Sequence, residues 1–256
     1  MKELFYIGLS WIPSVHPRTG LREKQSAEAR RILSFLDNNN YSENNYSSNN
    51  YFTHKTGGRP FFSDKHADFS ISHSKNMAAV SLVSSGARTG CDIQYVHPRK
   101  SYMEISRRFF HISEQAYVEN GGINQLVNFY RIWVLKESWL KLNGFSVFKM
   151  SGAPVFIIGT AGTETDAAGQ PEFFLYELFS PQQNQLYMLA IARQRIYHTS
   201  ENLNYFSGCS ASCFSESGSR FVSEPEFRWL SEPLELKRLE NIYAAQSPEK
   251  TVTPKM

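Results

Sequence analysis

The sequence predicts an α+β fold built from two similar halves, because a helix followed by an antiparallel hairpin occurs twice along the chain. The hairpins are expected at residues 69–83 and 173–192. Separate helices and antiparallel strands are typical of this fold class, and 256 residues are enough for a sizeable core. We expect the halves to meet near Gly86, which gives an N-terminal half (1–86), a C-terminal half (87–197) and a tail (198–256).

Apolar runs and turn residues define the predicted elements. In chain order they are strand 4–9, helix 21–36, hairpin strands 69–71 and 77–83, strand 89–96, helices 101–110, 113–120 and 125–142, strand 155–158, hairpin strands 173–179 and 186–192, and a last helix at 233–243. Residues 38–50 hold seven Asn and three Ser, a composition that predicts a loop. The helix at 125–142 is expected to stop at Asn143-Gly144.

The charge of the chain is uneven. Its net charge is +3, but residues 1–197 carry +5 and the remainder carries −2. A mildly basic body suits an anionic ligand or an acidic partner, and the excess is too small to argue for nucleic acid. No apolar run approaches the length that spans a membrane. The three cysteines lack zinc-site spacing, so we expect a reducing, cytoplasmic setting.

Residues 133–141 are the stretch with the clearest chemical content. On a helix, Glu137 and Lys141 lie one turn apart on the same face, so a carboxylate and an ammonium point into the same space. The alternative is a surface ion pair, which is common and weak.

A second group of polar residues lies on a predicted strand. Asp92 and Gln94 are two residues apart and share one face, whereas Cys91 and Ile93 share the other. Carboxylate and amide oxygens are hard ligands, so Asp92, Gln94 and Glu137 predict a Mg²⁺ site. The alternative is an aspartate that accepts hydrogen bonds from backbone amides.

A third group suits phosphate. Ser72 and His73 lie near the tip of the first predicted hairpin, and Arg22, Lys24 and Arg59 are further candidate cations. The alternatives are a turn at Arg59, a solvated helix face for Arg22 and Lys24, and an ordinary surface histidine. A phosphate-rich ligand, Mg²⁺, a carboxylate and a lysine together indicate phosphoryl or phosphodiester transfer.

Five motifs occur in order between residues 57 and 141: G-G-R-P-F-F, F-S-I-S-H-S, G-C-D-I-Q, R-F-F and W-V-L-K-E-S-W-L-K. The chain thereby resembles the large, surfactin-synthetase-activating type of 4′-phosphopantetheinyl transferase, whose patterns are G-K-P, F-(N/S)-I-S-H-S, G-(I/V)-D-(I/V)-E and W-x-x-K-E-(S/A)-x-x-K. This family is a pseudo-dimer of two α+β halves. The resemblance that these motifs carry spans about residues 57–192.

The resemblance implies that a Mg²⁺-dependent, monomeric enzyme moves phosphopantetheine from coenzyme A to a serine of an apo acyl or peptidyl carrier protein and releases 3′,5′-ADP. Asp92 and Glu137 would bind Mg²⁺, with Glu137 also acting as or orienting the base. Lys141 would neutralise the pyrophosphate. It also implies that Ser72, His73, Arg59 and Pro60 line the coenzyme A site, whereas Arg18, Arg22 and Lys24 are only candidates for the 3′-phosphate.

One departure from the family pattern concerns the metal. Gln94 replaces the usual glutamate, which keeps an oxygen ligand but removes a charge, so weaker Mg²⁺ binding is expected. Some animal-type members also lack that glutamate, so the change is compatible with activity. Because the change removes a charge from the metal site, the alternative function is a non-catalytic coenzyme A or carrier-protein binding module. A nucleic-acid binder has only the basic body in its favour, and we expect neither nucleic acid nor membrane as a partner.

Overall fold

The computed structural model describes residues 5–12, 20–37, 52–54, 59–62, 67–84, 86–159, 170–196, 225–229, 235–239 and 242–245. The predicted loop at 38–50 and the candidate Arg18 lie outside these residues. Among the helices of the described segments, none is both long enough and apolar enough to cross a membrane.

The described elements are strands and helices grouped in runs along the chain. Their order is β1 (Phe5–Trp11), α1 (Leu21–Asp37), β2 (Phe52–His54), β3 (Pro60–Phe62), β4 (Ala67–Ser74), β5 (Met77–Ser84), β6 (Ala87–Tyr95), α2 (Tyr102–Phe109), α3 (Ile112–Glu119), η2 (Gly122–Asn124), α4 (Gln125–Asn143), η3 (Val147–Gly152), β7 (Val155–Ile158), β8 (Glu172–Ser180), β9 (Gln185–Arg195), β10 (Glu226–Trp229), β11 (Glu235–Leu239) and β12 (Ile242–Ala245). The predicted α+β class is confirmed, and the predicted elements up to residue 192 are found within a few residues of their expected ends.

The same strand order occurs twice. In the first sheet, β1 pairs with β5 and β5 with β4; in the second, β6 pairs with β9 and β9 with β8, and all four pairings are antiparallel. Each set is therefore a strand, a helix and a hairpin whose second strand lies in the middle. Tail strands extend both sheets, with β10 parallel to β1 and β11 antiparallel to β8.

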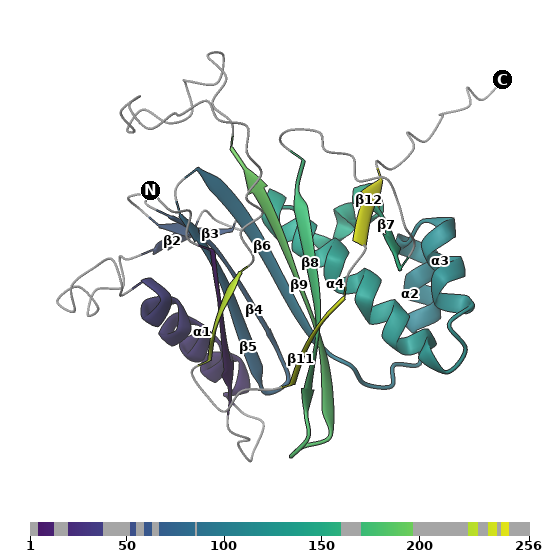
Figure 1. Ribbon diagram of the computed structural model, residues 1–256, viewed down its shortest axis with the longest axis horizontal. Coiled ribbons are helices and arrows are strands. Elements are labelled where there is room, and N and C mark those ends of the chain that lie inside the picture. The colour runs from purple at the N-terminus through teal and green to yellow at the C-terminus, as the bar shows by residue number, and fades with distance from the viewer. Residues whose placement is uncertain are drawn as a thin grey trace.

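The helices lie on the outer faces of the two sheets. Helix α1 covers one side of the molecule, and α2, α3 and α4 lie on the other, with the strands between them (Figure 1). Side chains of both sheets share one core, to which Ile7, Ala79, Ile93 and Leu189 contribute. Two outer cores lie beneath α1 and α4. The second half of the chain thus stacks on the first through their strands.

The predicted helix at 233–243 is wrong. Residues 235–239 form β11, in which Leu236 is opposite Leu178, and Ile242–Ala245 form β12 against β7. Without the tail, the edges of β8 and β7 that β11 and β12 occupy would leave backbone groups unpaired, and pairing with those edges outweighs the local helix propensity of this segment.

Candidate active site

Helix α4 contributes two of the predicted site residues. It runs without Gly or Pro and ends where Gly144 adopts a left-handed conformation (φ 68°) and donates to the carbonyls of Leu140 and Lys141. The predicted stop at Asn143-Gly144 is thus confirmed. Because α4 packs against β6 and β9, the face that carries Glu137 and Lys141 is directed at the second sheet.

The neighbouring Lys136 has a separate, structural task. Its ammonium and the Glu114 carboxylate are buried together, with Nζ 2.9 Å from Oε2. The same carboxylate accepts hydrogen bonds from the backbone of His111 and Phe156. This pair joins α4 to the start of α3 and to β7, so it holds the helix in place beside the site.

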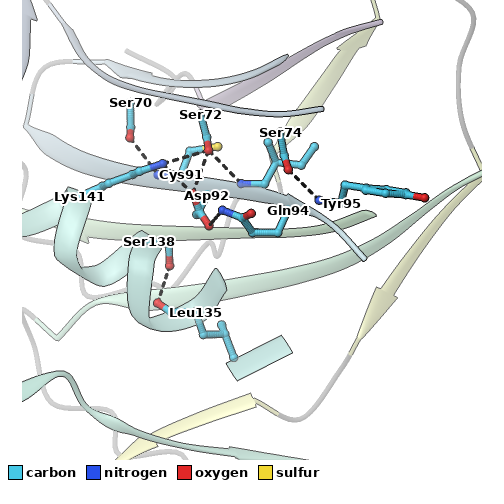
Figure 2. Close-up of polar contacts among 11 residues, drawn as sticks. Ser70, Ser72, Ser74, Cys91, Asp92, Gln94, Tyr95, Leu135, Ser138 and Lys141 are labelled. Carbon is cyan, nitrogen blue, oxygen red and sulfur yellow. Dashed lines mark hydrogen bonds and ion pairs between the residues drawn. The ribbon is translucent and has the colours of Figure 1, made fainter. Parts of the chain in front are cut away.

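Asp92 lies at the centre of the site and contacts three other side chains (Figure 2). Its Oδ1 is 2.7 Å from the Lys141 ammonium and accepts the Ser72 hydroxyl at 2.9 Å. Its Oδ2 accepts the Gln94 amide at 3.1 Å, and Lys141 also donates to the Ser72 Oγ at 2.9 Å. The predicted alternation on β6 is confirmed, since Cys91 and Ile93 lie in the inner core.

These contacts decide between the alternatives for Asp92 and Lys141. The ammonium of Lys141 is paired with Asp92 rather than forming a simple surface pair with Glu137, and Asp92 is held by side chains. Burial acts to lower the pKa of Lys141, but the charge of Asp92 and the hydrogen bond to it outweigh burial and raise that pKa. Lys141 therefore stays an ammonium.

The pKa of the Glu137 carboxyl group lies near neutral pH. Burial, followed by repulsion from Asp92, raises its pKa to about 7, although Lys141 opposes the shift. A carboxylate with such a pKa is half protonated near pH 7 and can both accept and release a proton.

His73 and Arg22 are near neighbours of this cluster. Burial lowers the pKa of His73, and the charges of Lys141 and Arg22 lower it further, while Asp92 acts in the opposite direction. Helix α1 is tethered here, because Gln25 donates to the Lys75 carbonyl at 2.8 Å. The positive charges of Lys141 and Arg22, with a neutral His73 beside them, thus suit a phosphate group.

Other predicted ligands lie differently. The Arg59 guanidinium pairs with Asp68 at 2.7 Å and donates to the carbonyls of Phe69 and Thr89, so it is engaged further along β4 and β6. Pro60 begins β3 and is opposite His54 of β2, and Lys24 is an exposed residue of the first turn of α1. Coenzyme A binding by these three residues stays a prediction.

The oxygen donors present suit a hard divalent cation. Asp92 and Glu137 are close enough for one to raise the pKa of the other, a repulsion that a cation relieves, and Gln94 lies beside Asp92. Among the described residues no group of three or more His, Cys, Asp and Glu is gathered in one place. The set therefore fits Mg²⁺ held by two carboxylates, with the rest of its shell from an amide, water or substrate oxygens.

Sequence reasoning missed two features around the site. Ser70, Ser74 and Asp68 bind the backbone of β6, and their i, i+2 spacing on one strand was the available signal. The close approach of α4 at Gly90 was also missed: an added Cβ would lie 2.0 Å from the Ser138 carbonyl oxygen. A glycine inside a strand run is a general signal for such an approach.

Comparison with known proteins matches this part of the chain to one family. Residues 88–191, which include Asp92, Glu137 and Lys141, match the model of the 4′-phosphopantetheinyl transferase superfamily. This match supports a relationship of the chain to that superfamily. Among curated relatives, 4′-phosphopantetheinyl transferase HetI of Nostoc sp. is 27% identical over 146 residues, covering 55% of this chain and 60% of the relative.

Two further relatives match a shorter part. 4′-phosphopantetheinyl transferase AcpT of Salmonella typhimurium is 34% identical over 95 residues, 36% of this chain and 49% of the relative. 4′-phosphopantetheinyl transferase gsp of Aneurinibacillus migulanus is 29% identical over 92 residues, 36% of this chain and 37% of the relative. The chain spans about half the length of the curated relatives it matches.

Proposed function

We propose that this protein is a 4′-phosphopantetheinyl transferase of the large type, which transfers phosphopantetheine from coenzyme A to a serine of an apo acyl or peptidyl carrier protein. The observation that carries the proposal is the contact of Lys141 with both Asp92 and Ser72, beside a Glu137 with a pKa of about 7. The superfamily match over residues 88–191 supports it.

In the proposed reaction, the carrier serine oxygen attacks the β-phosphorus of coenzyme A. Glu137, whose pKa is raised in the metal-free protein by burial and by Asp92, accepts the serine proton. The bond between the β-phosphorus and the bridging oxygen breaks, and 3′,5′-ADP leaves with the electron pair. Lys141 faces the pyrophosphate and stabilises the negative charge that develops there, or protonates the leaving phosphate. His73 and Arg22 bind coenzyme A phosphates.

Asp92 and Glu137, with Gln94 as a neutral oxygen donor, would hold Mg²⁺. When bound, the ion supplies Lewis-acid polarisation of the phosphoryl oxygens. The division of the chain at Gly86 and the monomeric state are part of the same proposal.

Mass spectrometry of carrier proteins tests the proposal. A panel of apo acyl and peptidyl carriers is incubated with the protein, coenzyme A and Mg²⁺, and each carrier is weighed. We expect one or more carriers to gain phosphopantetheine and 3′,5′-ADP to appear. Asp92→Ala should abolish the gain while circular dichroism shows an intact fold. No mass gain on any carrier contradicts the proposal.

The second candidate is a non-catalytic module that binds coenzyme A or a carrier protein. The observation in its favour is Gln94, which occupies a position where the family that the chain resembles usually has a second carboxylate. Its amide nitrogen donates a hydrogen bond to Asp92. Titration calorimetry separates the two: coenzyme A binding that does not respond to Mg²⁺, without any carrier modification, favours the module.

A further inference from the structure

Strands β4 and β6 are edge strands of different sheets that lie side by side. In the described part of the chain, β4 pairs with β5 in the first sheet, and β6 pairs with β9 in the second. The two edges are nevertheless in close contact along their length. A buried strand edge leaves backbone N–H groups that need acceptors.

Side chains of β4 supply these acceptors at four alternate positions. Asp68 Oδ2 accepts the amide of Thr89 at 2.8 Å, and the Oγ atoms of Ser70, Ser72 and Ser74 accept the amides of Cys91, Ile93 and Tyr95 at 3.0, 3.1 and 2.9 Å. We call this set the seam ladder. Each pair is separated by 21 residues, so the two strands run in the same direction in one constant register.

The seam ladder explains why serine recurs at every second position of F-S-I-S-H-S. Alternate residues of a strand face the same side, and the hydroxyl is short enough to bring a neighbouring backbone within hydrogen-bond distance. Ser70 and Ser72 are buried, as are Cys91 and Ile93. An unpaired amide at these depths would be costly, so the seam tolerates only one register.

Ser72 differs from its neighbours because its hydroxyl makes three contacts. It accepts from Ile93 N and Lys141 Nζ and donates its single proton to Asp92 Oδ1. A serine hydroxyl has one donor and two acceptor sites. Those three contacts use its full capacity, so no proton is left for a phosphate oxygen (Figure 2).

We propose that the seam ladder sets the register between the two sheets, and that Ser72 is the positioning residue through which this register aligns Asp92 with Lys141. β4 brings the hydroxyl, β6 brings the carboxylate and α4 brings the ammonium. Ser72 then acts through Asp92 and Lys141 and does not itself bind coenzyme A phosphate. Its kinetic consequence rests on the proposed transferase function, whereas the ladder itself does not.

Amide hydrogen exchange of the full chain, followed by NMR, tests the ladder without any activity. Ser70→Ala, Ser72→Ala and Ser74→Ala should each speed exchange of their own partner amide, 21 residues further on, by roughly fivefold or more relative to the other two. Ser81→Ala is the matched control, because Ser81 is a buried serine that accepts from the Thr89 side chain. Equal acceleration of all three amides in every variant overturns the ladder. If a buried variant fails to fold, Ser74→Ala at the partly exposed end decides.

Kinetics and calorimetry test the positioning role. Ser72→Ala should lower kcat by roughly ten- to a hundredfold, as expected when reacting groups are misplaced. Its coenzyme A Kd should change by less than about threefold, and Ser72→Thr should recover part of kcat. Ser70→Ala should keep kcat within about threefold of the wild type. A large rise in coenzyme A Kd with kcat retained makes Ser72 a ligand and overturns the role. If the wild type modifies no carrier, the proposed function fails, and amide exchange still decides the ladder.

Discussion

Glu137 lies where its own charge is disfavoured, so its contribution to stability depends on pH. Its pKa is raised from the usual 4.5 to about 7, first by burial and then by Asp92. Between these values the folded protein holds a proton that the unfolded chain has released. The free energy of unfolding therefore falls as pH rises from 4.5 to about 7.

The corresponding prediction is that Glu137→Gln stabilises the Mg²⁺-free protein above about pH 8, by on the order of 1–3 kcal/mol after allowance for solvent screening. The same variant should be neutral below about pH 4, where the carboxyl is protonated in both states. Urea unfolding at both pH values measures the difference. Glu104→Gln, at an exposed position of α2, is the matched control for the chemical change itself. Destabilisation by Glu137→Gln at high pH would contradict the assignment.

Glu137 and Lys141 lie one turn apart, but substitutions at the two positions should have different effects on turnover and ligand binding. Glu137→Gln removes the proposed base, and we expect kcat to fall by roughly 10²–10⁴-fold. Lys141→Ala removes the cation proposed to face the leaving group and leaves Asp92 without its ammonium partner, so kcat should fall and coenzyme A should bind more weakly while Mg²⁺ affinity is retained. Turnover and calorimetry with each ligand separate the two. Wild-type turnover in both variants would show that this helix face is structural.

In the proposed metal site, Gln94 supplies a neutral amide oxygen on β6 where a second carboxylate would be anionic. Its amide nitrogen is 3.1 Å from Asp92 Oδ2, so its oxygen is the remaining donor. Gln94→Glu replaces that amide with a second anionic oxygen, and we expect the variant to stay active and to need less Mg²⁺ for half-maximal turnover. A titration of activity against Mg²⁺ measures this. An unchanged or higher Mg²⁺ requirement would contradict the assignment of Gln94 as a ligand.

At the scale of elements, each half packs its helix against a glycine in its first strand. A Cβ on Gly8 of β1 would lie 2.2 Å from the end of the Ile32 side chain of α1. A Cβ on Gly90 of β6 would lie 2.0 Å from the Ser138 carbonyl oxygen and 2.5 Å from the Leu142 nitrogen, both backbone atoms of α4. A side chain can rotate away but a helix backbone cannot, so α4 is held more strictly than α1.

Gly90→Ala should therefore push α4 away from β6 and separate Lys141 from Asp92. We expect a loss of roughly 1–3 kcal/mol in the free energy of unfolding or more, together with a fall in kcat larger than any change in coenzyme A affinity. Gly152→Ala is the control, because nothing lies within 4 Å of its added Cβ. Thermal unfolding and turnover of both variants measure the effect. A Gly90→Ala protein with wild-type stability and rate would refute the close approach.

At the scale of the molecule, the tail joins the two sheets. Strand β10 pairs with β1 of the first sheet, while the Phe227 ring packs on Tyr176 of β8 in the second, at 5.0 Å between ring centroids. Phe227 and Trp229 cover the core between the sheets. Strand β10 of the tail therefore packs on the body of the protein.

Phe227→Ala should lower the free energy of unfolding by roughly 1–3 kcal/mol, less than for a fully buried phenylalanine. Leu236→Ala, an apolar residue of β11 that is 41% exposed, is the control and should cost much less. Urea unfolding monitored by far-ultraviolet circular dichroism measures both. Equal effects of the two substitutions would show that β10 does not close the inner core.

Local patterns predicted the helices α1 to α4 and the strands β1, β4 to β6 and β7 to β9, but not the short strands β2 and β3. Helix α4 contains good helix formers and no Gly or Pro before it ends at Gly144, and β6 alternates Cys91 and Ile93, which lie in the inner core, with Asp92 on its other face. Such patterns depend on residues within a few positions of each other. The shared face of Glu137 and Lys141, and that of Asp92 and Gln94, could therefore be predicted from spacing alone.

Only the tertiary structure decided how these faces meet. The pairing of Lys141 with Asp92, the engagement of Arg59 with Asp68 and the strand form of residues 235–239 all depend on partners far away in the chain. The F-S-I-S-H-S motif suggested phosphate ligands, but its serines also face the amides of β6, which lie 21 residues away. The spacing of side chains along one strand does not identify the strand of the other sheet to which they are hydrogen-bonded. The sequence by itself therefore determined which groups are available, and the packing of two sheets and α4 determined which of them touch.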